Sequence, residues 1–279
     1  MLVDPQFRQC VAFLCTEERR GKKIPGATGF FLGMDCSEQP DMYYVATARH
    51  VIDMSRPYGR LYLRVNKSIA GVDHVEVPHD SWVFHPSSDV AVFPLTLSPQ
   101  DYEYVCVPSS YLLSSDELSH KPHVHVGTQI VTIGLFRKYY GQDRLQSVVR
   151  FGRISSMPDE KVPIELSPGC QPVMIDAYLA EMLSWGGESG SPVFTYGLGV
   201  HGPEALPMSY QNPKVVGLLH GHYPLEEKIK PVGSTIESVD LNSGIAVVIL
   251  SQAIIETLEL PQLQQERSEA TAKAKKGSR

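Results

Sequence analysis

Short segments, either apolar or with alternating apolar and polar residues, follow one another along most of this chain. They are separated by turns rich in glycine, proline and aspartate. In the first half these segments cover residues 10–15, 27–32, 42–48, 61–65, 72–77 and 90–95. In the second half they cover residues 123–126, 129–136, 146–154, 173–177, 192–195, 215–220 and 245–250. Many short strands with close turns and little helix predict an all-β fold, which we expect to be two packed, six-stranded antiparallel β-barrels.

The polar, tyrosine-rich segment 101–119 is the predicted crossover between the two barrels. We therefore place an N-terminal barrel at residues 8–115 and a C-terminal barrel at residues 120–258. Residues 251–258 start with a serine and carry apolar side chains at helical spacing, which predicts a short C-terminal helix with Ser251 as its N-cap. The remaining residues, 262–279, are rich in Gln, Glu, Lys and Ala and are predicted to be a disordered tail.

The charge of the chain restricts its partners. The net charge is −6 although the last 18 residues carry five basic and two acidic side chains, so the rest of the chain is strongly acidic. An acidic body argues against a nucleic-acid partner, which needs a basic face. No apolar run is long enough to span a membrane, and the first residues lack the pattern of a signal peptide. Five scattered cysteines favour reduced thiols and a cytoplasmic location over a disulfide framework.

The segment Trp185-Gly-Gly-Glu-Ser-Gly-Ser-Pro-Val-Phe194 centres on Ser189. Glycine permits positive φ angles and close approach of the backbone, so Gly187 and Gly190 suit a tight turn that exposes a hydroxyl. A serine hydroxyl is a weak nucleophile and needs a neighbouring base. Two upstream segments offer partners, because His50 ends one apolar run and Asp89 begins another.

The order His50, Asp89, Ser189 is that of the chymotrypsin-type triad. The local sequences match as well. Thr47-Ala-Arg-His50 resembles Thr-Ala-x-His, Asp89-Val-Ala-Val resembles Asp-Ile-Ala-Leu, and Gly187-Glu-Ser-Gly-Ser-Pro192 resembles Gly-x-Ser-Gly-Gly-Pro. Gly26-Ala-Thr-Gly-Phe30 resembles the Gly-Ser-Gly-Phe strand of high-temperature-requirement proteases. From about residue 10 to residue 258 the chain thus resembles chymotrypsin-fold serine peptidases, in pattern closest to the bacterial and viral trypsin-like branches.

This resemblance implies a serine endopeptidase that hydrolyses polypeptide substrates through an acyl-enzyme, with no metal or organic cofactor. His50 would accept the proton of Ser189, and Asp89 would hold the required tautomer of His50. The main-chain N–H groups of Gly187 and Ser189 would form the oxyanion hole. The alternative is a catalytically silent protease fold that binds peptide strands in the same cleft.

The resemblance also indicates where a substrate would bind. Leu183, six positions before Ser189, falls at the base of the primary specificity pocket, and without an acid there no preference for Arg or Lys is expected. His220 and His222 lie in the segment that matches the pocket wall and are candidates to contact substrate. An acidic or amide side chain is one hypothesis for the preferred substrate, and a small or apolar one is the other. His220 has an alternative role as a partner of Asp89.

Two further features bear on regulation and on metals. Glu188 stands where digestive members carry the aspartate that pairs with a freed N-terminus, yet no Ile-Val-Gly-Gly-like sequence precedes the first strand. We therefore expect loop ordering or an activating protein partner instead of propeptide cleavage. His120, His123 and His125 suggest a metal site, but no carboxylate or thiol stands at a clear ligand spacing. We interpret them as solvated histidines on a strand.

Overall fold

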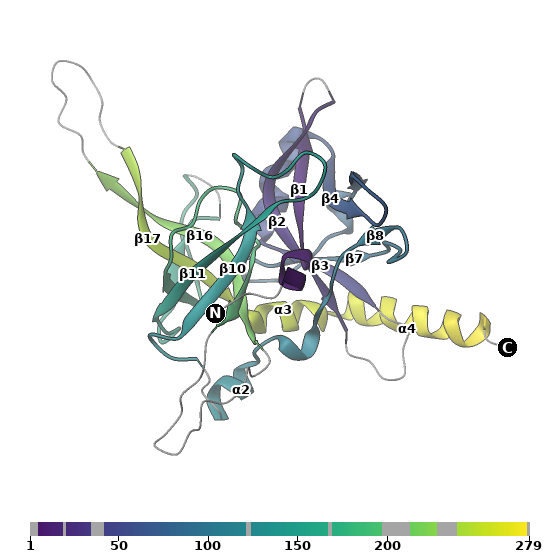
Figure 1. Cartoon of the computed structure of the whole chain (residues 1–279). Coiled ribbons are helices and arrows are strands. Elements are labelled where there is room, and N and C mark those ends of the chain that lie inside the picture. Colours follow the sequence, from purple (N-terminus) through teal and green to yellow (C-terminus); the bar gives the residue numbers. More distant parts are fainter. Residues whose placement is uncertain are drawn as a thin grey trace.

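The computed structural model describes residues 5–18, 21–34, 42–120, 124–166, 169–196, 213–227 and 239–277. Strands dominate both halves of the chain, which confirms the predicted all-β class (Figure 1). None of the helices in these ranges is both long enough and apolar enough to cross a membrane.

The N-terminal sheet contains nine strands in the described residues, in the order β5-β4-β1-β2-β3-β7-β6, with β8 paired to β4 and β9 paired to β2. All neighbours are antiparallel except β2 and β9. Its elements are η1 (Pro5–Gln9), β1 (Val11–Glu17), β2 (Lys23–Gly33), β3 (Tyr43–Thr47), α1 (Arg49–Ser55), η2 (Arg56–Tyr58), β4 (Leu61–Lys67), β5 (Val72–Glu76), η3 (His79–Ser81), β6 (Val83–Phe84), β7 (Ala91–Leu95), β8 (Tyr102–Glu103) and β9 (Val107–Pro108).

The prediction of six strands for this half is wrong. Three of the nine strands, β6, β8 and β9, are only two residues long. A two-residue strand has no periodicity that a sequence can display, so these pairings form only in the folded chain. Strands β8 and β9, together with η4 (Ser109–Tyr111) and α2 (Ser115–His120), occupy the segment predicted to be a polar connection.

The second half forms a closed barrel in the order β10-β11-β14-β17-β16-β15, which confirms the predicted six-stranded C-terminal barrel. Strands β12 and β13 form a separate hairpin, and β16 and β17 form a long ribbon (Figure 1). These elements are β10 (Gln129–Leu135), β11 (Ser147–Ser156), β12 (Val162–Ile164), β13 (Val173–Ile175), β14 (Ala177–Glu181), β15 (Pro192–Thr195), β16 (Val215–Glu227) and β17 (Val239–Leu250).

The strand predicted at residues 123–126 does not form in the described residues, which begin again at Val124. His125 instead starts a tight turn, because its carbonyl accepts the N–H of Thr128 and its own N–H donates to the Thr128 hydroxyl. A hydroxyl that satisfies a nearby main-chain N–H favours a turn over a strand. His123 lies outside the described residues, as does the side chain of His120.

A continuous apolar core joins the two halves. Buried side chains of the N-terminal sheet, such as Phe30 and Val92, belong to the same cluster as Phe194 and Val215 of the barrel. Helix α3 (Ser251–Leu258) contacts β7 of the sheet and both β16 and β17 of the barrel. The two halves therefore hold each other in place, and the side chains at their boundary have fixed relative positions.

The C-terminal end differs from prediction in two details. Helix α3 forms as predicted, but Leu250 is its N-cap, and the Ser251 hydroxyl donates to the carbonyl of Leu113 at 2.5 Å. The tail predicted to be disordered is helix α4 (Pro261–Gly277). Its first turns are fixed because Leu263 is buried and Arg267 donates to the hydroxyl of Tyr44 at 3.3 Å. Ala, Gln, Glu and Lys are strong helix formers, so the same composition also suits a docked helix.

Candidate active site

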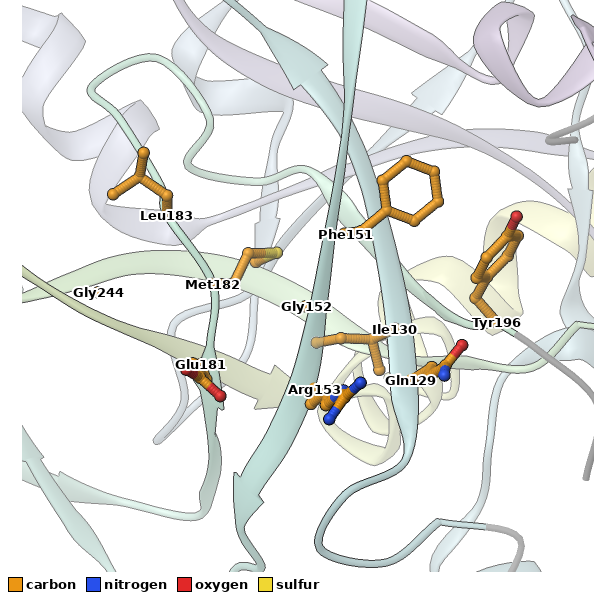
Figure 2. A pocket seen from close by; sticks show the side chains of 10 residues that line it. All are labelled: Gln129, Ile130, Phe151, Gly152, Arg153, Glu181, Met182, Leu183, Tyr196 and Gly244. Atoms are coloured by element: carbon orange, nitrogen blue, oxygen red, sulfur yellow. The ribbon is translucent and has the colours of Figure 1, made fainter. Parts of the chain in front are cut away.

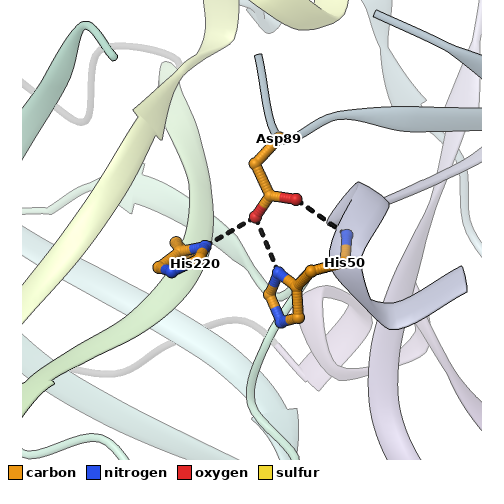
Figure 3. A group of neighbouring side chains, drawn as sticks. All are labelled: His50, Asp89 and His220. Carbon is orange, nitrogen blue, oxygen red and sulfur yellow. Dashed lines mark hydrogen bonds and ion pairs between the residues drawn. The ribbon is translucent and has the colours of Figure 1, made fainter. Parts of the chain in front are cut away.

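Asp89, just before strand β7, contacts His50 in helix α1 (Figure 3). His50 does not end a strand as predicted. Strand β3 stops at Thr47, and His50 is the second residue of helix α1. Its N–H is one of the first-turn groups that lack a helical partner, and it donates to Asp89 Oδ1 at 2.8 Å. The second oxygen, Asp89 Oδ2, lies 2.7 Å from His50 Nδ1.

His220 supplies a third contact to the same carboxylate. Its Nδ1 atom lies 2.6 Å from Asp89 Oδ2, and its ring packs edge-on against that of His50 with centroids 4.8 Å apart. Burial alone would raise the pKa of Asp89, but the charge and hydrogen bonds of the two histidines outweigh it and hold this pKa well below its usual range. Asp89 is therefore an ionised carboxylate that accepts three N–H bonds.

These bonds fix the tautomer of His50. An ionised carboxylate only accepts hydrogen bonds, so the proton of His50 must be on Nδ1. When the ring is neutral, the other nitrogen, Nε2, is left as an acceptor. This is the form of imidazole that can act as a general base.

Ser189 lies in a loop that we call the serine loop, residues 184–191, between β14 and β15. It is half-buried, and its hydroxyl donates to the main-chain carbonyl of His220 at 2.8 Å. Within the described part of the chain, the Ser189 hydroxyl makes this hydrogen bond and makes none to the His50 ring. The structure thus brings Ser189 to the residue whose ring contacts Asp89, with the hydroxyl directed at a carbonyl.

Two glycines shape the serine loop around Ser189. Gly187 and Gly190 have φ angles of +108° and +84°, in the region that favours glycine. A Cβ on Gly190 would lie 2.2 Å from both the Thr28 carbonyl oxygen and the Thr47 hydroxyl. In the described structure the N–H groups of Gly187 and Ser189 donate to no main-chain or side-chain acceptor. Neither N–H group is therefore committed to an intramolecular hydrogen bond there.

Glu188 is 1% exposed and anchors the serine loop from inside. Its carboxylate accepts a bond from the Arg150 guanidinium and another from the N–H of Trp185, the latter at 2.9 Å. Burial raises the pKa of Glu188 although both partners lower it. The partner of Glu188 is thus an arginine of β11. Arg150 could not be identified from the sequence, since a strand pattern does not show which partner a side chain contacts.

Of the three predicted substrate-binding residues, the structure brings His220 into this cluster. Leu183 is half exposed and lines a cavity of about 650 Å³ on the barrel (Figure 2). The other lining residues are Gln129, Ile130, Phe151, Gly152, Arg153, Glu181, Met182, Tyr196 and Gly244, so neither Ser189 nor His50 contributes. His222 lies half-buried on β16, opposite Ala246. His220 takes the alternative role considered above, as a partner of Asp89.

The same three side chains could be considered as metal ligands. One ligand atom from each of His50, Asp89 and His220 lies within 4.8 Å of the others. However, Asp89 Oδ2 is at hydrogen-bond distance from both Nδ1 atoms, so protons on these nitrogens account for the close approach. The donor set therefore fits a hydrogen-bonded cluster better than a metal centre.

Comparison with known proteins gives structural likenesses only. No protein-family model matches the chain, and no curated protein matches it. A serine-to-alanine mutant of Rv3671c from M. tuberculosis H37Rv, in its inactive form, is 16% identical with a TM-score of 0.46, covering 92% of this chain and 94% of that one. Human heparin binding protein is 9% identical with a TM-score of 0.47, covering 93% of each chain.

A third structure, the scabies mite inactivated protease paralogue S-D1, is 13% identical with a TM-score of 0.47 and covers 92% of this chain and 93% of that one. With TM-scores below 0.5, these likenesses carry no argument about the chemistry of this chain.

Proposed function

We propose that this protein is a serine endopeptidase in which Ser189 attacks the peptide carbonyl, His50 is the general base and Asp89 orients His50. The observation that carries the proposal is the buried Asp89 carboxylate, which contacts both the main-chain N–H and the Nδ1 atom of His50, at 2.8 and 2.7 Å. Two contacts from one carboxylate fix both the position and the tautomer of the imidazole. This is the arrangement that a general base for a serine nucleophile requires.

In the first step the Ser189 hydroxyl leaves the carbonyl of His220 by rotation about its Cα–Cβ bond and donates to His50 Nε2. As the oxygen attacks the substrate carbonyl, the proton passes to His50, and the C–O bond forms to give a tetrahedral oxyanion. His50 then donates the proton to the leaving amine, and the C–N bond breaks to give the acyl-enzyme. Water then attacks the acyl carbon and passes a proton to His50, which returns it to the Ser189 oxygen as the acyl C–O bond breaks and the acid is released.

The developing oxyanion needs donors, and the open N–H groups of Gly187 and Ser189 are the proposed pair. A main-chain donor costs no reorganisation during reaction when the loop that carries it is already fixed. Because Leu183 offers no negative charge, we expect cleavage after apolar, small, acidic or amide side chains and not after Arg or Lys. The partner we propose is therefore a polypeptide strand.

The second candidate is a catalytically silent module that binds peptide strands. It is favoured by one observation, that the Ser189 hydroxyl donates to the His220 carbonyl at 2.8 Å and not to His50. A hydroxyl that stayed in this bond would have no base to activate it.

A covalent probe distinguishes the two candidates. We expect a fluorophosphonate to label the wild-type protein at Ser189 and a peptide library to be cleaved, with both reactions absent in Ser189→Ala. Ser191→Ala is the matched control, because Ser191 is fully buried two positions away and its hydroxyl has no hydrogen-bond partner among the described residues. It should label at the wild-type rate. Peptide binding without any labelling or cleavage of the wild type would support the silent module instead.

A further inference from the structure

Thr28 on β2 is completely buried and reaches the serine loop with both its main chain and its side chain. Its N–H donates to the carbonyl of Ser189 at 3.0 Å. Its hydroxyl donates to the carbonyl of Gly187 at 3.0 Å and accepts the N–H of Leu135 at 2.9 Å. The single hydroxyl proton and the acceptor capacity of this side chain are therefore both in use.

The two carbonyls that Thr28 holds belong to alternate peptide groups of the serine loop. The other ends of these peptides are held as well, because the N–H of Glu188 donates to the carbonyl of Trp185 at 3.2 Å and that of Gly190 donates to the carbonyl of Leu219 at 2.7 Å. The peptide between them carries the N–H of Ser189, and its carbonyl accepts the N–H of Ser191 at 2.9 Å. Of the three N–H groups in these peptides, only that of Ser189 has no protein acceptor among the described residues.

The carbonyl of Thr28 extends this network to the helix that carries the base. It accepts the hydroxyl of Thr47 at 2.7 Å, and Thr47 is the last residue of β3, three positions before His50. One residue therefore connects the loop of the nucleophile to the segment that leads into α1.

We propose that Thr28 is a positioning residue. Its hydroxyl fixes the Gly187–Glu188 peptide, which lies between the peptides that carry the N–H groups of Gly187 and Ser189, and so keeps both N–H groups directed at the reacting carbonyl. This inference rests on the proposed hydrolase function and assigns the positioning of its oxyanion hole to a strand of the other half of the molecule. The sequence motif Gly26-Ala-Thr-Gly-Phe30 contains the residue, but no pattern in it shows that the hydroxyl reaches Gly187.

Valine has nearly the shape of threonine without the hydroxyl, so Thr28→Val leaves the Gly187 carbonyl and the Leu135 N–H buried without their partner. Thr28→Ser keeps the hydroxyl and loses only a methyl group. Thr257→Val is the matched control, because Thr257 is also completely buried and its hydroxyl donates to a main-chain carbonyl, that of Ala253, within α3.

Two measurements test the proposal on the full chain. The first is the rate of fluorophosphonate labelling together with kcat and KM for a cleaved peptide. Since loss of a direct oxyanion donor lowers kcat by about 10²- to 10³-fold, loss of a residue that positions the donors should lower kcat by about 10- to 100-fold with KM unchanged. Thr28→Ser should recover most of the rate, and Thr257→Val should keep it.

The second measurement is hydrogen exchange of peptides that cover residues 184–191, which needs no catalysis. Thr28→Val should exchange there about 2- to 10-fold faster than the wild type, and Thr257→Val should not. If wild type and variants all fail to label, the proposed function is wrong, while exchange still reports whether Thr28 orders the loop. Equal exchange and equal kcat in Thr28→Val and Thr257→Val, at equal melting temperature, would overturn the inference.

Discussion

The Nδ1 atom of His220 lies 2.6 Å from Asp89 Oδ2, so a strand of the C-terminal barrel donates a hydrogen bond to an aspartate of the N-terminal half. The same oxygen lies 2.7 Å from His50 Nδ1. Two imidazoles that come from opposite halves thus share one buried carboxylate oxygen. The contact both joins the halves and limits the orientations open to Asp89.

The first prediction concerns His220. His220→Ala should lower the free energy of unfolding by about 1.5–3 kcal/mol, the usual range for a hydrogen bond to a charged group. It should reduce kcat far less than His50→Ala does, because the His220 ring contacts Asp89, whereas Ser189 contacts only the main-chain carbonyl of His220, which the substitution keeps. Urea denaturation and peptide kinetics measure both effects. His125→Ala, in an exposed turn, is the control and should change stability by less than about 0.5 kcal/mol. A His220→Ala protein as stable as the wild type would contradict this assignment.

The second prediction concerns the charge of Asp89. Its pKa in the folded protein lies below the ordinary value of 3.8, mainly because the contacts to His50 and His220 outweigh the effect of burial. The ionised form therefore stabilises the fold, fully so above the unfolded value, and this stability is lost as the pH falls below about 5 toward the folded pKa. The wild type should lose more stability than Asp89→Asn between pH 7 and pH 3, measured by urea denaturation.

Asp89→Asn also tests the catalytic role, since an amide side chain can donate to His50 Nδ1 and so favour the wrong tautomer. We expect kcat to fall by about 10⁴-fold while the fold is kept. A variant with the kcat of the wild type would show that Asp89 stabilises the fold without orienting a base.

The third prediction concerns the pair of Arg150 and Glu188. Arg150→Met leaves the carboxylate of Glu188 buried with only the Trp185 N–H as partner. Loss of one partner of a buried ion pair costs about 3–5 kcal/mol, so we expect a loss of about 3 kcal/mol here and a slower reaction of Ser189 with a fluorophosphonate. Arg150→Met combined with Glu188→Met removes both charges and should recover most of the stability. A double variant that is no more stable than Arg150→Met would argue against the pair as the cause.

The contact between His50 and Asp89 was predictable because each lies beside a strand whose apolar pattern is visible in the sequence. The other contacts were less so: the pairing of His220 with Asp89 was one of two alternatives, and nothing indicated Arg150 as the partner of Glu188. Arg150 meets Glu188 across 38 positions, and His220 meets Asp89 across 131. Such contacts depend on the register of strands in the closed barrel, and a shift of one residue would turn either side chain to the other face.

The start of helix α1 also could not be predicted from the local sequence. Residues 42–48 are apolar and predict a strand, but nothing local indicates that the helix begins at Arg49. Part of the reason lies 39 positions away, in the Asp89 oxygen that accepts the N–H of His50 at 2.8 Å. A carboxylate near the first turn of a helix is favourable, so a distant residue helps to set where this helix starts.

The fourth prediction concerns Gly190. Gly190 and Gly59 have nearly the same φ, +84° and +87°, but a Cβ would lie 2.2 Å from two oxygens at Gly190 and would meet nothing within 4 Å at Gly59. Gly59→Ala should therefore lower the free energy of unfolding only by the cost of an alanine in the left-handed conformation, about 1–2 kcal/mol, and keep its activity. Gly190→Ala should lower the free energy of unfolding further, because the added Cβ would push Thr28 and Thr47 away and displace the serine loop. Its reaction with a fluorophosphonate should therefore be lost as well. Thermal denaturation and fluorophosphonate labelling rates of the two variants, measured side by side, test this. Equal losses of stability and labelling in both would mean that the packing of Gly190 against Thr28 and Thr47 does not shape the serine loop.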